Sequence, residues 1–193
     1  SATTAVLGGN VTNDGNAPVT ERGVCYSLTQ NPTTANTKLA IGTGTGTFSN
    51  TVSGLTSNTT YYAKAYAINA QGTAYGTQIT FTTVSLSLAS LTTSIPTNIT
   101  SSSAILGGNV TSDGNATVTE RGICYNTSQN TTTGNTKVII GSGTGIFSNT
   151  ITGLLFNTIY YARSYAINSQ GTAYGNEVNF QTSVDLSLAS LTT

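Results

Sequence analysis

Apolar and polar residues alternate along several short stretches of this chain. The alternation is clearest from Tyr61 to Asn69. Further runs rich in apolar and β-branched residues cover positions 6–11, 19–26, 38–41, 47–52 and 74–82. Turn signals such as Asp14-Gly15 separate these runs at the spacing of about 8 to 12 residues that is typical of β-sandwiches. No stretch shows the roughly 3.6-residue period of an amphipathic helix, so the pattern predicts an all-β protein.

The strand pattern occurs twice, with an offset of 99 residues. Ala5–Thr12 returns as Ala104–Thr111, and Thr20–Tyr26 returns as Thr119–Tyr125, each with a single Val-to-Ile change. This period is too long for the unit of a solenoid, and it matches the size of a small all-β domain of about 100 residues. The chain is therefore expected to contain two domains of the same fold.

One motif indicates the family of both domains. Leu55, Thr59 and Tyr61 are followed by Ala63, Ala65 and Ala67, and the second copy has Leu154, Thr158 and Tyr160 at the equivalent positions. This pattern resembles the tyrosine-corner signature of fibronectin type III domains, which are immunoglobulin-like β-sandwiches, with Tyr61 and Tyr160 as corner residues. The repeats are similar to those of secreted and surface bacterial proteins, which use them as spacers, adhesion modules and fibre components. The resemblance implies an extracellular or cell-surface protein.

The two domains differ in what precedes them. Residues 86–99 provide a first strand, strand A, ahead of the second domain, whereas residues 1–4 alone precede the first strand of the first domain. The last eight residues, Leu186–Thr193, repeat Leu86–Thr93 without change. We therefore expect a first domain over 1–84 that lacks strand A, a complete domain over 85–183, and an orphan donor or linker strand over 184–193.

The orphan strand suggests how copies of the chain assemble. Burial of Leu186, Leu188 and Leu191 would contribute roughly 1.5–3 kcal/mol each. If the domains run end to end, ten residues reach only about 35 Å, which is too short to return to the groove of the first domain. The expected function is therefore a structural protomer that polymerises head to tail, its last strand completing the next copy.

Two alternatives stay open. The chain is either a tandem spacer or adhesion module of a large bacterial surface protein, holding a ligand or carbohydrate, or a window of a continuous array. One face of the longest strand in each domain presents a candidate contact stripe: Tyr62, Lys64, Tyr66, Tyr161, Arg163 and Tyr165. This stripe is either a cross-strand ladder of aromatic and cationic side chains on a solvated face or a contact for neighbouring subunits or a carbohydrate.

The amino-acid composition limits the kinds of functional site that the chain can form. Charged residues make up 6% of the 193 residues, with six Lys and Arg against six Asp and Glu, whereas an average soluble domain has about 25%. The chain has no His and one Cys per domain, so we expect no catalytic residue, metal site or cofactor. Neither a basic patch for nucleic acid nor a long apolar run for membrane insertion is present. The expected partners are other copies of the chain, and glycans on Ser, Thr or Asn are a further candidate.

Overall fold

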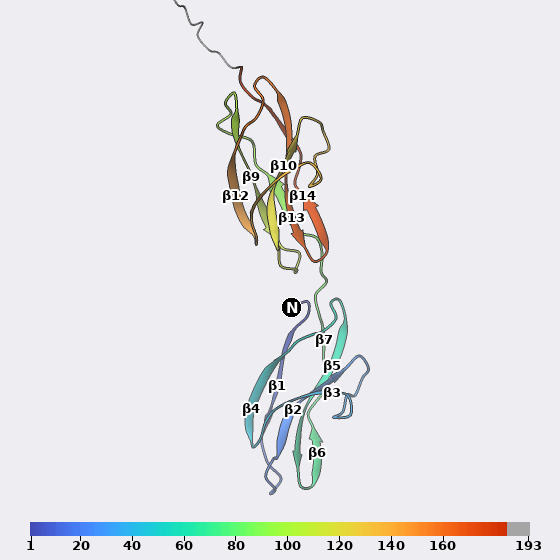
Figure 1. Ribbon diagram of the computed structural model, residues 1–193. Helices are drawn as coiled ribbons and strands as arrows, with labels where there is room; N and C mark the ends of the chain where they lie inside the picture. The colour runs from blue at the N-terminus through green and yellow to red at the C-terminus, as the bar shows by residue number, and fades with distance from the viewer. Residues whose placement is uncertain (185–193) are drawn as a thin grey trace, which may run out of the picture. The chain divides into compact units, whose positions relative to one another are not determined.

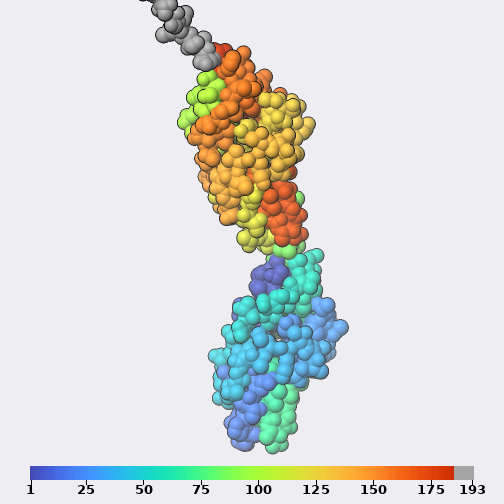
Figure 2. Space-filling model, viewed as in Figure 1, coloured from blue at the N-terminus to red at the C-terminus, as the bar shows by residue number. Residues whose placement is uncertain are grey.

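The computed structural model describes residues 1–184 (Figures 1 and 2). The regular elements of these residues are all β-strands (Figure 1). The chain divides into two compact units, Ser1–Leu86 and a second that begins at Ser87. Within the described residues, no helix is present that could cross a membrane. Each unit is described below by itself.

The first unit pairs its strands into two sheets that pack face to face. A two-stranded sheet has the order β1-β4, and a five-stranded sheet has the order β3-β2-β5-β6, with β7 also pairing with β5 (Figure 1). Leu7 and Val52 from the small sheet pack against Val24, Tyr61 and Ala63 from the large one. The strands are β1 (Ala5–Val11), β2 (Glu21–Ser27), β3 (Thr37–Gly42), β4 (Gly46–Val52), β5 (Thr60–Asn69), β6 (Gly72–Tyr75) and β7 (Ile79–Thr82).

The second unit repeats this arrangement and adds one strand. Its large sheet has the order β11-β10-β13-β14, with β15 also pairing with β13. Its small sheet has three strands in the order β12-β9-β8, because β8 pairs with the edge of β9 that is opposite β12. The strands are β8 (Ser90–Thr93), β9 (Ser103–Ser112), β10 (Glu120–Asn126), β11 (Thr136–Gly141), β12 (Gly145–Thr152), β13 (Ile159–Asn168), β14 (Gly171–Tyr174) and β15 (Val178–Gln181).

These pairings confirm the predicted all-β fold with two tandem β-sandwiches. The predicted orphan strand over 184–193 lies outside the described residues except for Val184. The run over 74–82, expected as one strand, is divided into β6 and β7. The division falls at Gly76, whose N–H donates to Ala65 O at 2.9 Å, so the two strands pair with opposite ends of β5.

A buried tyrosine closes the same corner of each sandwich. The Tyr61 hydroxyl accepts a hydrogen bond from Thr56 N, and the Tyr160 hydroxyl accepts one from Leu155 N, both at 2.9 Å. Each ring also stacks on a phenylalanine, Phe81 at 5.6 Å in the first unit and Phe180 at 5.7 Å in the second. The loop before β5 or β13 is thereby tied to the core.

We expect Tyr160→Phe to lower the free energy of unfolding by about 1 kcal/mol, because Leu155 N–H loses its acceptor while the ring still stacks. Urea unfolding of the variant measures the loss. Tyr161→Phe is the matched control, since Tyr161 points to the other face of β13. Equal losses for the two variants would contradict a structural role for the Tyr160 hydroxyl.

The thiols of Cys25 and Cys124 are free and have no exposed surface. Burial raises the pKa of the Cys124 thiol to about 11, which disfavours the reactive thiolate. We expect neither cysteine to react with a thiol reagent at pH 8 in the folded chain, and both to react after unfolding in urea. Reaction of either thiol in the folded chain, or a disulfide between copies, would contradict this burial.

Candidate functional site

Three adjoining hollows run along the first unit, with β1 and the turn that follows it on one side and the β5–β6 part of the large sheet on the other. Their volumes are about 310, 240 and 260 Å³. The third hollow shares Asn13, Ala67 and Ala74 with the first, and Ala65 and Gly76 with the second. Together the three hollows form one elongated depression, which we call the strand groove.

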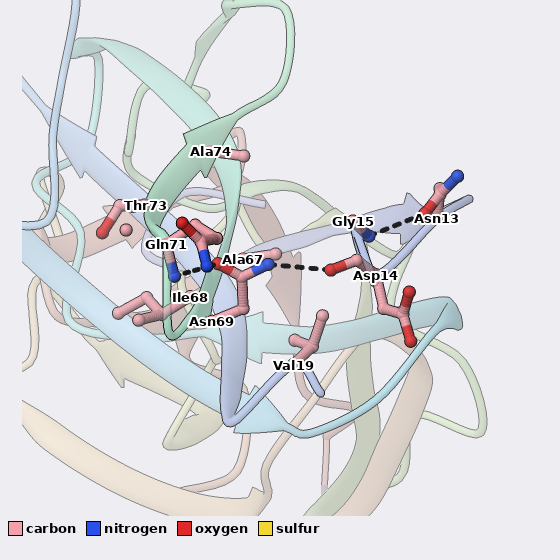
Figure 3. Close-up of a pocket in the computed structure, with 11 residues that line it drawn as sticks. Asn13, Asp14, Gly15, Val19, Ala67, Ile68, Asn69, Gln71, Thr73 and Ala74 are labelled. Atoms are coloured by element: carbon pink, nitrogen blue, oxygen red, sulfur yellow. Dashed lines mark hydrogen bonds between the residues drawn. The ribbon is translucent and has the colours of Figure 1, made fainter. Parts of the chain in front are cut away.

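A turn and an asparagine shape one end of the strand groove (Figure 3). Gly15 and Asn16 adopt positive φ angles of 70° and 62°, which glycine and asparagine tolerate best. The Asn69 side chain holds this turn by donating from Nδ2 to Asp14 O at 2.7 Å (Figure 3). Asn69 Oδ1 accepts from Gln71 N at 2.9 Å, so the asparagine cannot turn away from the groove.

In the second unit, a segment of the chain itself lies in the equivalent place. Ser87 N donates to Gly114 O at 2.9 Å, and Asn168 Nδ2 donates to Ser87 O at 2.8 Å. Gly114 and Asn168 are the counterparts of Gly15 and Asn69 at the 99-residue offset. From there the segment continues into β8, which runs antiparallel to β9.

The other end of this segment is fixed by side chains. Thr93 N donates to Asn176 Oδ1 at 3.1 Å, and Thr93 Oγ1 accepts from Ser164 N at 3.0 Å. Thr93 pairs with Gly108 on β9 and is 8% exposed. The counterparts of Ser164 and Asn176 in the first unit are Ala65 and Thr77. In the first unit, Ala65 therefore still has the backbone N–H that Ser164 uses to bind Thr93. The two polar side chains of Ser164 and Asn176 are replaced by those of Ala65 and Thr77.

The residues that line the filled groove of the second unit are more deeply buried than their counterparts in the first unit. Val110, Ala166 and Ala173 are buried in the second unit, with exposed fractions of 1%, 0% and 8%. Their counterparts Val11 and Ala67 are half-buried, and the counterpart Ala74 is exposed. Among residues 1–184, no strand pairs with the edge of β1 that faces away from β4. Within the described part of the chain, the first unit thus presents an open groove where the second unit has a filled one.

The predicted assembly residues Leu186, Leu188 and Leu191 lie outside the described residues. Burial of these three leucines stays a prediction, and in the filled groove their counterparts are not all buried. Leu88 is 46% exposed, whereas Ala89 and Thr93 are buried and Leu91 packs against the core. The inward positions are therefore 89, 91 and 93, with a register shift between Ser90 and Leu91. Every second residue counted back from Thr93 gives this set, because alternate residues of a strand face the same side. Selecting the leucines of the segment does not give it.

The predicted contact stripe is wrong at Tyr66 and Tyr165, its last residue in each unit. Tyr66 is 2% exposed and Tyr165 is fully buried, so neither can present its ring to a partner. Tyr66 fits because Gly23, which has no side chain, lies opposite it on β2. Lys38 covers the ring with Nζ 5.7 Å from its centroid. Tyr62, Lys64, Tyr161 and Arg163 are half-buried.

A charged cluster explains why this ring is held so firmly. The Tyr66 hydroxyl donates to Glu21 Oε1 at 2.6 Å, and Lys38 Nζ lies 2.8 Å from the same oxygen. Hydrogen bonds from Lys38 and Tyr66 lower the pKa of Glu21, while burial and the bond to Glu21 raise the pKa of Tyr66. Glu120, Lys137 and Tyr165 repeat the cluster in the second unit. The contacts of these residues join neighbouring strands of one sheet. In residues 1–184, no group of metal-ligating side chains accompanies them.

Comparisons with known proteins found a distant similarity to several solved structures. No protein-family model and no curated protein matches this sequence. Among solved structures, the sensor domain of the anti-sigma factor RsgI4 from Pseudobacteroides cellulosolvens is 19% identical, over 52% of this chain and 99% of that one, with a TM-score of 0.40. A segment of two fibronectin type III domains from chicken tenascin is 15% identical, over 93% and 91% of the two chains, with a TM-score of 0.35.

Chicken CNTN1 domains FN1–FN3 are 17% identical, over 95% of this chain and 67% of that one, with a TM-score of 0.38. The fold itself rests on the strand pairing and on the corner tyrosines described above. Each of the two units is a fibronectin type III-like, immunoglobulin-like β-sandwich.

Proposed function

We propose that the chain is a structural protomer that joins copies head to tail, with residues 186–193 of one copy lying in the strand groove of the next. One observation carries the proposal. The eight residues Leu86–Thr93, which enter the filled groove of the second unit, occur again without change as Leu186–Thr193, and the first unit has an equivalent groove that is open. Because the two segments have the same sequence, we expect them to bind to equivalent surfaces.

The filled groove supplies the register for the inserted strand. Leu91 lies opposite Val110 and Thr93 opposite Gly108 in the second unit. By the same pairing, Leu191 would lie opposite Val11 and Thr193 opposite Gly9 of the receiving copy. Ala189, Leu191 and Thr193 would face inward, and Asn69 and Gly15 would hold Ser187. The strand would then complete a three-stranded small sheet in the first unit.

The energetics favour a durable junction. Full burial of a leucine such as Leu191 stabilises by about 1.5–3 kcal/mol, and each main-chain hydrogen bond adds about 0.5–1.5 kcal/mol. The contact joins two different surfaces, the groove of one copy and the last strand of another. A contact of this heterologous kind leaves one groove and one strand unused at every stage, so it produces an open filament unless a ring closes.

Chain length favours insertion into a second copy. Ser183 is held by its hydrogen bond to Thr100 O at the end of the second unit where β13 begins, whereas Ser87 lies beside Asn168, where β13 ends. The ten residues of β13 cover about 30 Å, and residues 185–193 reach about 30 Å when extended. If residues 185–193 ran back along their own second unit toward residue 85, their whole length would be needed to cover that distance. None of these residues would then remain to enter the groove of the first unit.

The broader context supports a non-enzymatic, extracellular or cell-surface role. Two tandem fibronectin type III-like units are consistent with a spacer or adhesion module. Such a module is the second candidate function, and in that case the copies stay monomeric until a ligand is added. The open groove favours the polymer, because an unpaired β edge is a site for adding a strand.

We expect the full chain to form oligomers whose mass increases with concentration in sedimentation velocity, and a chain that ends at residue 184 to stay monomeric. A synthetic peptide with the sequence of Leu186–Thr193 should bind the shortened chain with a stoichiometry of one. Undiminished assembly of the shortened chain would contradict strand insertion. A full chain that stays monomeric and does not bind the peptide would show insertion into its own groove instead.

Gly76→Ala provides a sharper test of the groove. A Cβ at Gly76 would have its nearest neighbours at 3.7 Å, so the first unit should fold normally. At the counterpart Gly175, a Cβ would lie 2.5 Å from Thr93 Oγ1 and 2.7 Å from Thr93 N. The variant should therefore keep its melting temperature and bind the peptide more weakly by about tenfold or more, measured by calorimetry.

The control is Gly134→Ala, which introduces the residue that the first unit has at Ala35. A Cβ there meets its nearest atom, Thr132 Oγ1, at 3.5 Å, which is ordinary contact. This variant should bind the peptide and assemble as the parent chain does. Unchanged peptide binding by Gly76→Ala would show that the inserted strand does not follow the register of β8.

A further inference from the structure

The second unit has exposed apolar side chains at the end where the chain leaves it. Leu155, Phe156, Ile159 and Val184 are 64%, 62%, 49% and 51% exposed. The first two lie in the loop between β12 and β13, and Ile159 begins β13. Val184 follows Ser183, whose carbonyl accepts a hydrogen bond from Asn157 N at 3.1 Å in the same loop. We call these four residues the exit patch.

The first unit has polar residues at all four equivalent positions. Thr56, Ser57 and Thr60 are the counterparts of Leu155, Phe156 and Ile159 at the 99-residue offset. Ser85 corresponds to Val184, because Val84 accepts from Asn58 N as Ser183 accepts from Asn157 N. The first unit folds with polar residues at these four positions, with Val84 beside them 43% exposed, so the fold does not require the exit patch. Clustered exposed apolar side chains of this kind indicate a contact with another molecule.

The proposed strand insertion determines what lies near the exit patch. Ser183 is fixed in the second unit, and Ser187 would be held between Gly15 and Asn69 of the receiving copy, as Ser87 is held between Gly114 and Asn168. Four steps along an extended chain cover at most about 14 Å. The receiving loops, residues 13–16 and 69–72, must therefore lie next to the exit patch whenever a strand is inserted.

We propose that the exit patch is a second contact surface of the same junction, which packs against loops 13–16 and 69–72 of the next copy. The proposal rests on the proposed function. These two loops are rich in asparagine, glutamine and glycine and carry a single charged side chain, Asp14. Covering them with apolar side chains therefore removes few ionised groups from water.

The proposed contact explains why the second unit has these four apolar residues at the end where the chain leaves it, whereas the first unit has polar residues at the same positions. The corresponding end of the first unit continues through residues 85–86 by peptide bonds into the second unit. A junction between copies has no such covalent link and gains from an added apolar contact. The patch contains no Lys or Arg, so the residues themselves give no electrostatic reason to favour an anionic membrane surface.

The test uses a pair of proteins that favour one junction over further growth. The receiver is the chain that ends at residue 184, and the donor is the full chain with Gly76→Ala, whose own groove should bind a strand about tenfold or more weakly. Calorimetry compares this donor with the same donor carrying L155T and F156S, the residues that the first unit has at these positions. We expect the added changes to weaken binding by about tenfold, to the level of the peptide alone.

The matched control is a donor with Leu28→Thr, which replaces a 62% exposed leucine by the residue that the second unit has at Thr127. It should bind as the unmodified donor does, and urea unfolding should show that all donors are equally folded. Equal binding by the L155T/F156S donor would overturn the exit patch and leave strand insertion standing. Failure of both the donors and the peptide to bind would overturn the proposed function, and this inference with it.

Discussion

The unpaired edge of a β-sheet is the constraint on which this structure depends. Backbone N–H and C=O groups along an edge strand need partners, and a sandwich also needs its inner face covered. In the second unit, β8 meets both needs, because it pairs with β9 and contacts β13 and β14. The first unit builds the same two sheets from a closely similar sequence, and its edge at β1 is open in the described residues. In the proposed assembly, this difference between two closely similar repeats makes the first unit the receiver.

Much of the fold could be predicted from the sequence because it depends on local patterns. Period-two alternation identifies β5 and β13, and the Asp-Gly turns mark where strands end. The 99-residue repeat gives the number of sandwiches, and the spacing of Leu55, Thr59 and Tyr61 identifies the corner that ties the loop to the core. The repeat of Leu86–Thr93 at the end of the chain is also visible in the sequence, and the proposed strand insertion is based on it.

The sequence could not show features that depend on the opposite strand. Tyr66 looks like an exposed aromatic residue because it alternates with Tyr61, but Gly23 across the sheet leaves room for its ring to lie flat and be covered by Lys38. Leu88 looks like a core residue because it is leucine, but the register shift between Ser90 and Leu91 changes which residues face inward. Alternation predicts two faces of a strand, and the neighbouring strand decides which face is covered.

The position of the linker has a consequence for how a new chain folds. Two identical eight-residue segments and two grooves would allow the first unit to capture Leu86–Thr93 as soon as it is synthesised, before the second unit exists. Val84 is fixed beside Ser1 and Asn58, near the start of β5, whereas Gly15 and Asn69 lie about 30 Å away at its far end. Three chain steps from Val84 to Ser87 cover about 10 Å. Under the proposed strand insertion, Leu86–Thr93 therefore cannot reach the groove of the first unit in the same chain, and the short connection removes a kinetic trap that the repeated sequence would otherwise create.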